Sequence, residues 1–345
     1  MNPSLVGSEM CIRDSNGTNK SISTLNFAPD LVWIKARSVG YSHSLQDTLR
    51  GPGTSTSIYP DLDSAAGTYG AYGQISAFGT DGFTVAGGGH GSYPTAQVNQ
   101  NGVTYASWNW KGLDHDRNLA AINTDGTIPS IVSANPKSGF SIVKYTAPSD
   151  GGVYTNTVGH GLTSAPEIII QKRTNLAADW YVHTSLIDGS NDYLVLNSNA
   201  AKVDNSLSFV VTSSTFTDWG WNGSTMINYF FHSVPGYSKI GIYNGNTSST
   251  NTINVGFAPS FLMIKRTDPS GDWRIYDRER DSGNLPQRID HNLAANSNAA
   301  EYDATSGSTG YAWFSSTGFY FDTNQTNSDI NANGGTYIYL SLIHI

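Results

Sequence analysis

Cysteine is almost absent from this sequence, and its absence sets the first limits. The single cysteine, Cys11, excludes an internal disulfide, and the eight histidines are scattered without the spacing of a zinc site. Charged side chains are also scarce, at 13% with a net charge of −8, so the chain lacks the basic surface that nucleic acids or anionic membranes attract. No apolar run approaches the length of a membrane span. We therefore expect neither nucleic acid nor a membrane as a partner.

Glutamate is rare as well, which argues against a glycosidase. Beyond residue 15 the glutamates are Glu167, Glu279 and Glu301, whereas a glycosidase holds two carboxylates at a defined separation. Glu279 lies in the alternating charge segment 277–281, which is typical of a solvated loop with weak ion pairs. The sequence also has no nucleophile elbow, zinc-protease helix or phosphate loop. We predict that the chain is not an enzyme and has no cofactor.

Two short aspartate segments could supply oxygen ligands for calcium. They are residues 61–63 and 114–116, but calcium needs more oxygens than one such pair offers, and aspartates are ordinary in turns. The glycine-rich segment 87–91 neither follows a strand–helix pattern nor precedes a helix, so it indicates a loop tip rather than a phosphate site. We predict no metal site.

The two ends of the chain resemble translated library-adapter DNA. Residues 340–345 back-translate to an element whose opposite strand encodes Met-Cys-Ile-Arg-Asp, the residues at 10–14. A signal peptide is the alternative, but the first 15 residues have neither a basic start nor a long apolar core. We interpret residues 1–15 and 340–345 as adapter artefacts, and the remainder as a natural fragment truncated at both ends.

What the sequence does contain is typical of an all-β protein. It is rich in Ser, Thr, Asn and Gly, with 36 glycines, yet 12% of its residues are aromatic, which disordered chains lack. Short β-branched and aromatic runs alternate with Asn, Gly and Ser clusters, as in sandwiches and barrels. We predict an all-β fold of tandem β-sandwich, jelly-roll-like repeats.

One segment occurs three times, at residues 27–35, 164–172 and 257–265. Each copy contains an Ala-Pro pair followed by an apolar run and ends in a lysine, and proline is tolerated at the start of a strand. The repeats therefore predict three buried strands, each begun by a proline. Similar elements flank these segments and keep the same order where they recur.

The repeats divide the chain into three units of about 100 residues. Their predicted bounds are 16–112, 139–235 and 236–339, with residues 113–138 as a linker that could add a strand of its own. The first unit lacks the opening Gly-Phe-Ser-type strand of the others, which agrees with truncation at the adapter. Units of this length are sandwich-sized, not the short modules of a solenoid.

Two kinds of repeated side chain suggest roles. Lys35, Lys172 and Lys265 end the apolar runs, and we expect their ammonium groups to extend into water. Trp180 and Trp273 occupy matching positions of their repeats, which favours a packing role for both.

Two tryptophan pairs are the candidate ligand-binding residues. Trp108 and Trp110 alternate along one strand, and Trp219 and Trp221 have the same spacing in the second unit. Two indoles on one face could form a platform on which a sugar stacks. The favoured alternative is that they fill the sandwich core.

The sequence also resembles an uncharacterised repeat family of virion proteins from tailed bacteriophages, known from marine environmental sequence. The segments that carry the resemblance are residues 27–35, 158–162, 264–268, 271–273 and 329–339. The resemblance implies a tail-fibre or tail-associated structural protein, located on the virion, that contacts other virion proteins and forms homo-oligomers. Its loops would contact a host surface, with host polysaccharide as a partner. It implies no catalytic residues.

Two other functions stay open at this point. The chain could be a carbohydrate-binding module of a secreted or cell-surface protein, which requires an exposed aromatic pair on one face. A polysaccharide depolymerase is the third alternative, and it requires a pair of carboxylates.

Overall fold

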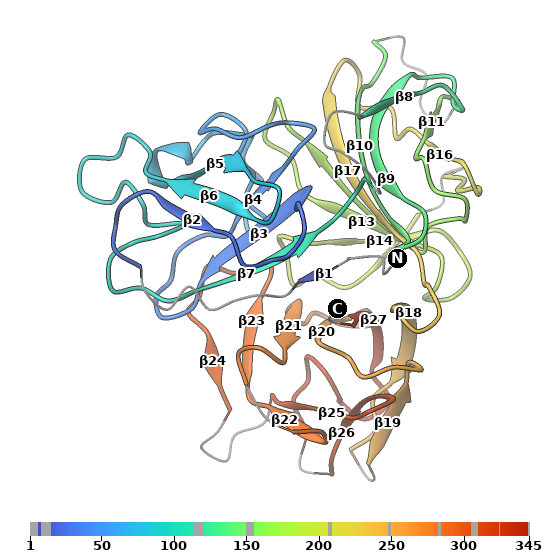
Figure 1. Ribbon diagram of the computed structural model, residues 1–345. Helices are drawn as coiled ribbons and strands as arrows, with labels where there is room; N and C mark the ends of the chain where they lie inside the picture. The colour runs from blue at the N-terminus through green and yellow to red at the C-terminus, as the bar shows by residue number, and fades with distance from the viewer. Residues whose placement is uncertain are drawn as a thin grey trace.

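The structure is a computed structural model that describes residues 6–7, 15–113, 120–149, 155–205, 209–247, 250–281, 284–304, 310–323 and 325–343. These residues form 27 strands and one 3-10 turn, η1 (Gly70–Tyr72). The predicted all-β, sandwich-type fold is confirmed. Figure 1 shows three lobes around a common centre, and each lobe corresponds to one repeat. The described residues contain no helix long and apolar enough to cross a membrane.

The first unit comprises residues 15–113 together with strand β1. Its strands are β1 (Val6–Gly7), β2 (Lys20–Ile22), β3 (Leu31–Ala36), β4 (Ser44–Asp47), β5 (Gln74–Phe78), β6 (Phe83–Ala86) and β7 (Tyr105–Trp110). The inner sheet, facing the centre of the molecule, has the order β1–β7–β3–β4, and the outer sheet has the order β2–β6–β5.

The second unit comprises residues 120–235. Its strands are β8 (Ala121–Asn123), β9 (Ser130–Asn135), β10 (Phe140–Thr146), β11 (Thr157–Gly159), β12 (Ile168–Arg173), β13 (Tyr181–Thr184), β14 (Asp192–Val195), β15 (Val203–Asp204), β16 (Thr215–Thr217) and β17 (Thr225–Phe231). The inner sheet has the order β15–β14–β13–β12–β17–β10–β9–β8, and β11 and β16 form the outer sheet.

The third unit comprises residues 236–343. Its strands are β18 (Ser238–Asn244), β19 (Asn251–Asn254), β20 (Phe261–Arg266), β21 (Arg274–Asp277), β22 (Gln287–Ile289), β23 (His291–Ala294), β24 (Tyr302–Asp303), β25 (Ala312–Phe314), β26 (Gly318–Phe321) and β27 (Thr336–Leu342). The inner sheet has the order β18–β27–β20–β21–β23–β24, and the outer sheet has the order β19–β26–β25–β22.

The three proline-led strands have equivalent surroundings, as the repeats predict. Strands β3, β12 and β20 each begin two residues after the proline and pair antiparallel on both sides, with β7 and β4, β17 and β13, or β27 and β21. The cross-strand register is also equivalent. It pairs Trp33 with Trp108, Ile170 with Tyr229, and Met263 with Leu340.

Each inner sheet has two buried faces. One face packs on the unit's own outer sheet and forms a private core. This core includes Ile34 and Phe83 in the first unit, Val143 and Phe230 in the second, and Ile264 and Phe319 in the third. The opposite faces of all three inner sheets meet in one shared core. Its largest members come from all three units: Trp33, Trp108, Trp110, Trp180, Tyr229, Phe231, Phe261 and Trp273. The units are therefore three sandwiches that share a fourth core, and they are not separately packed domains.

Main-chain hydrogen bonds link the units in a closed ring. At each junction a main-chain N–H in the segment that follows β4, β14 or β23 donates a hydrogen bond to another unit. The acceptor is the carbonyl of the residue just beyond that unit's proline-led strand. The three bonds are Ala66 N to Thr174 O (2.8 Å), Lys202 N to Thr267 O (2.9 Å) and Glu301 N to Arg37 O (2.7 Å). The first unit thus contacts the second, the second contacts the third, and the third contacts the first.

The three repeated lysines are buried at these junctions, so the expectation that they reach water is wrong. Lys35, Lys172 and Lys265 are each 0% exposed, and burial lowers the pKa of each to about 8. The reason is that main-chain carbonyls solvate each ammonium group. Lys172 Nζ, for example, donates to Ala178 O (2.5 Å) in its own unit and to Asp63 O (2.8 Å) in the first unit.

The predicted linker is part of the second unit. Strand β9 pairs with β10 and β8 pairs with β9, so residues 113–138 contribute two strands to the eight-stranded sheet. Alternation explains this, because Val132 is buried in the private core while Ile131 faces outward.

The presumed adapter segments also take part in the sheets. Val6 and Gly7 pair with β7 in the place that β10 and β18 occupy in the other units, and β27 extends to Leu342. The adapter origin of these segments stays a prediction.

Candidate functional site

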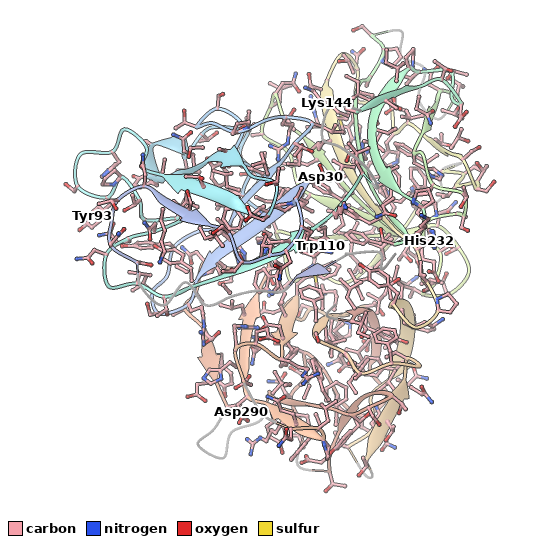
Figure 2. The ribbon with its side chains drawn as sticks, viewed as in Figure 1. Asp30, Tyr93, Trp110, Lys144, His232 and Asp290 are labelled. Carbon is pink, nitrogen blue, oxygen red and sulfur yellow. The ribbon has the colours of Figure 1, made fainter. Side chains whose placement is uncertain are left out.

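A groove of about 390 Å³ lies where the first unit meets the third, and we call it the tyrosine groove. Four tyrosines from the first unit dominate its lining. The described residues that line it are Gly40, Tyr41, Ser42, Tyr69, Tyr72, Tyr93, Ala96, Gln97 and, from the third unit, Asn298. Figure 2 shows Tyr93 at the outer edge of the first unit, far from the shared core.

One wall is the turn that carries Tyr69 and Tyr72. It follows the 3-10 pattern, with Gly70 N donating to Gly67 O (3.1 Å) and Tyr72 N to Tyr69 O (3.0 Å). Gly70 is required because a Cβ there would lie 2.0 Å from Thr54 O. Tyr69 N also donates to the hydroxyl of buried Tyr59 (3.0 Å), so the turn is anchored to the body of the unit.

The opposite wall is the segment around Tyr93. His90 stacks on Tyr72, with ring centroids 4.5 Å apart, and its second neighbour is Tyr93 at 5.8 Å. His90 Nδ1 accepts hydrogen bonds from Ser92 N (3.3 Å) and Tyr93 N (3.0 Å), so the ring proton sits on Nε2. This stack fixes the direction of both tyrosine rings.

The floor is held by buried groups of both units. Lys35 Nζ donates to Asn298 O (3.2 Å), and His43 Nε2 lies 3.1 Å from Ser297 O. Because Trp33 Nε1 donates to His43 Nδ1 (2.8 Å), the proton of His43 is on Nε2 and points to the third unit. Burial lowers the pKa of His43 to about 3, so the ring stays neutral.

The carboxylate behind the groove has a structural role. Asp61 is buried, burial raises its pKa, and Oδ1 accepts the main-chain N–H of His43 (3.0 Å). Asn197 and Asn296 accept the N–H of Trp180 and Trp273 in the same way (2.8 and 2.9 Å). Because a neutral amide oxygen accepts the equivalent hydrogen bond in the other two units, this contact requires no acid. We therefore assign Asp61 the role of positioning the main chain and not a catalytic role.

The structure places Trp108 and Trp110 in the shared core. They are 0% and 3% exposed, so neither can stack on a sugar. Trp108 Nε1 donates to Asp277 Oδ2 of the third unit (3.0 Å), and Trp110 contacts Phe140, Phe231 and Phe261 at ring distances of 6.0 to 6.4 Å. Figure 2 shows Trp110 close to the centre, where the units meet.

Trp219 and Trp221 are not the counterparts of that pair. They lie between β16 and β17, outside any strand, and the true counterparts of Trp108 and Trp110 are Tyr229 and Phe231. Both indoles are half-buried and pack against Tyr181, Trp219 edge-on at 4.7 Å and Trp221 in a tilted contact at 5.4 Å. They cover the outer face of β13, and their ring planes meet at 74°, so the two indoles do not present one flat surface of the kind a sugar platform would need.

An acidic cluster that sequence reasoning missed lies in the second unit. Oxygen atoms of Asp188, Asp192 and Asp204 lie within 4.8 Å of one another. Lys202 Nζ is bonded to all three, at 2.5 Å from Asp188 and 3.2 Å from Asp192, so an ammonium group occupies the centre where a cation would bind. Two aspartate segments were considered above as calcium ligands. In the first, Asp61 accepts the main-chain N–H of His43, and the second, residues 114–116, lies outside the described residues.

The sequence contained only a weak signal for the tyrosine groove. Tyr69, Tyr72 and Tyr93 lie in a segment of the first unit that has no close copy in the others, so repetition could not reveal them. The usable signal was the departure from the repeat, with several tyrosines and glycines between residues 67 and 93.

Comparison with known proteins gives a family but no activity. A search of curated proteins and a search of solved structures each returned no match. A family profile described as a domain of unknown function, DUF7483, matches residues 8–344 and therefore spans all three units. The chain belongs to the DUF7483 family.

Proposed function

We propose that this chain is a non-catalytic structural protein that binds carbohydrate in the tyrosine groove. The observation that carries the proposal is an open groove lined by four tyrosines on a rigid scaffold. Aromatic rings present apolar faces to the C–H faces of sugars, while phenol and amide groups form hydrogen bonds with sugar hydroxyls. The groove volume lies within the range of small-molecule sites, about 300 to 1,000 Å³.

The resemblance to phage virion proteins suggests the biological setting. In that setting the chain is a tail or tail-fibre component, its partners are other virion proteins and host-surface polysaccharide, and it forms homo-oligomers. Weak binding at each groove would then be amplified by the copies on one particle. A secreted or cell-surface location is the alternative. The closed ring of junction bonds supports either, because both require a rigid display scaffold.

A binding assay with matched variants tests the proposal. Tyr93 is 51% exposed and lines the groove, whereas Tyr302 is 42% exposed on the third unit and is not among the lining residues. We expect the protein to bind at least one member of a panel of capsular and lipopolysaccharide glycans by calorimetry. Tyr93→Ala should weaken binding at least tenfold, and Tyr302→Ala should leave it unchanged.

Two results would contradict the proposal. One is binding that both variants retain in full, which would place the ligand elsewhere. The other is the appearance of new reducing ends when the protein is incubated with the bound glycan, which would indicate a depolymerase.

A further inference from the structure

The three units place different side chains at equivalent positions around each junction. Two of these positions lie on either side of the buried ring residue that precedes β4 in the first unit and β21 in the third. The third position lies in the turn before the last strand of each unit, β7 or β27. In the third unit these residues are Asp272, Arg274 and Asp329, and in the first unit they are Ser42, Ser44 and Gln97.

The equivalence of the third position rests on hydrogen bonds. In the first unit Asn99 N donates to Thr95 O (2.8 Å), and Tyr105 Oη donates to Ala96 O (2.7 Å). In the third unit Asn331 N donates to Asn327 O (3.0 Å), and the hydroxyl of Tyr337 donates to Ser328 O (2.8 Å). Gln97 and Asp329 each lie two residues after the start of this turn.

In the third unit these positions are closed by ion pairs. Arg274 Nη2 lies 3.0 Å from Asp272 Oδ2 and 2.6 Å from Asp329 Oδ2, and the guanidinium group is mostly buried. In the second unit aromatic packing closes the equivalent position. Tyr181, the counterpart of Arg274, contacts Trp219 and Trp221 there. In the first unit the counterpart is the short Ser44, and Ser42 and Gln97 line the groove instead.

We infer that the tyrosine groove is a single, first-unit site for an uncharged oligosaccharide segment, an inference that rests on the proposed function. None of the lining residues that the structure describes carries a charge. Lys35, beneath the floor, is 0% exposed and already donates to Ala36 O (2.6 Å) and Asn298 O. An acidic sugar would therefore bury its carboxylate without a cationic partner, which is unfavourable. The ligand bridges two units, since Asn298 belongs to the third.

The test is calorimetry of the full chain with defined probes. We use neutral trisaccharides of glucose, mannose and galactose and, in parallel, trigalacturonate. The expected result is binding of at least one neutral probe with a stoichiometry of one per chain, and at least tenfold weaker binding of trigalacturonate. A stoichiometry of three, or preference for the acidic probe, overturns the inference.

A second arm rebuilds the ion-paired closure in the first unit. The triple variant Ser42→Asp, Ser44→Arg and Gln97→Asp should abolish binding of the neutral probe, because larger or charged side chains then replace Ser42 and Gln97 in the lining. Tyr72→Ala supplies an independent loss of at least tenfold if the triple variant does not fold, as judged by circular dichroism. Unchanged binding in a folded triple variant, or in Tyr72→Ala, overturns the inference.

The outcomes separate the two proposals. If trigalacturonate binds in place of the neutral probes and Tyr93→Ala abolishes that binding, the inference fails while carbohydrate binding at the groove stands. If no glycan of either panel binds, both fail.

Discussion

Trp273 in the third unit donates its indole N–H to the main-chain oxygen of Val195 in the second unit, at 2.9 Å. The counterpart Trp180 donates to Tyr59 O of the first unit (3.0 Å), and His43 Nε2 approaches Ala294 O of the third (3.1 Å). One buried ring at each junction thus contacts the same position of the neighbouring unit. The contacts close into a ring, so no unit can unfold without exposing the shared core.

The first prediction concerns this indole. Trp273→Phe retains most of the apolar ring but leaves Val195 O without its indole donor, and we expect a loss of about 1–3 kcal/mol in the free energy of unfolding. Chemical denaturation followed by fluorescence and circular dichroism should still show one transition, because the three units share a core. Trp313→Phe is the control, since its indole bond to Asp322 is longer (3.3 Å) and lies within one unit. Separate unfolding of the third unit would contradict the prediction.

Local pattern was sufficient to predict the strands. The proline-led apolar runs become β3, β12 and β20, and Trp180 and Trp273 have the buried, repeated role that their positions indicated. Repetition of a short segment carries this information, because equal sequences in equal contexts form equal strands.

Contacts between units could not be predicted in the same way. Nothing in the sequence shows that the three sandwiches share a core, and without that contact Lys35 is expected to extend into water instead of donating to Asn298 O. The segment 277–281 is a similar case, because Asp277 and Arg280 are buried partners at 2.6 Å and not a solvated pair. The groove depends on the same missing information, since Asn298 reaches it from the third unit.

The second prediction concerns the Tyr229–Asp47 bond between the second and first units. The phenol donates to Asp47 Oδ2 (2.7 Å), and Arg50 Nε pairs with the same oxygen at 2.7 Å. Tyr229→Phe should lower the free energy of unfolding by about 1.5–3 kcal/mol, the usual value for a bond to a charged group.

A double-mutant cycle checks the assignment. Asp47→Asn removes the charge, and the interaction energy with Tyr229→Phe should be on the order of 1 kcal/mol or more, as for residues in one buried network. At the junction between the third and second units, Leu340 and Thr184 occupy the positions of Tyr229 and Asp47. Leu340 is apolar and Thr184 is uncharged. Additive effects of the two substitutions would contradict a direct bond.

The third prediction is a loss of stability in acid. Burial lowers the pKa of His43 and His183 to about 3 and that of His160 to about 4, against an ordinary value of about 6.5. The unfolded chain therefore binds more protons than the folded chain as the pH falls below about 6.5. The free energy of unfolding should fall by about 1.4 kcal/mol per pH unit for each of the three, between pH 6 and pH 4.5.

Denaturant titrations at several pH values measure this slope. His291 acts in the opposite direction, because its bond to Asp281 raises its pKa and adds stability at acid pH. His291→Asn should accordingly lower the free energy of unfolding at and below pH 6.5, and leave its slope between pH 6 and pH 4.5 nearly unchanged, because this ring is protonated in both states there. A free energy of unfolding that is constant from pH 7 to pH 4.5 would contradict the buried, neutral state of the three histidines.

The fourth prediction is a stabilising substitution at His183. The ring is 2% exposed, stacks on Phe209 at 4.5 Å and meets Trp219 edge-on at 4.8 Å, and neither ring nitrogen has a hydrogen-bond partner among the described residues. Buried polar atoms without partners cost about 1–3 kcal/mol each to desolvate, whereas a phenyl ring in the same stack costs nothing of the kind. The adjacent cavity of about 80 Å³ leaves room for the slightly larger ring.

His183→Phe should therefore raise the free energy of unfolding at pH 7 and reduce the acid slope by about one third, since one of three neutral histidines is removed. His160→Phe is the matched control. Its ring also stacks on a phenylalanine, Phe230, but Nδ1 accepts from Leu162 N (3.2 Å) and Nε2 lies 3.2 Å from Thr212 O, so the same substitution breaks two bonds and should destabilise the fold. Equal destabilisation by both substitutions would mean that the nitrogens of His183 are bonded in solution, and that the cavity beside it holds their partner.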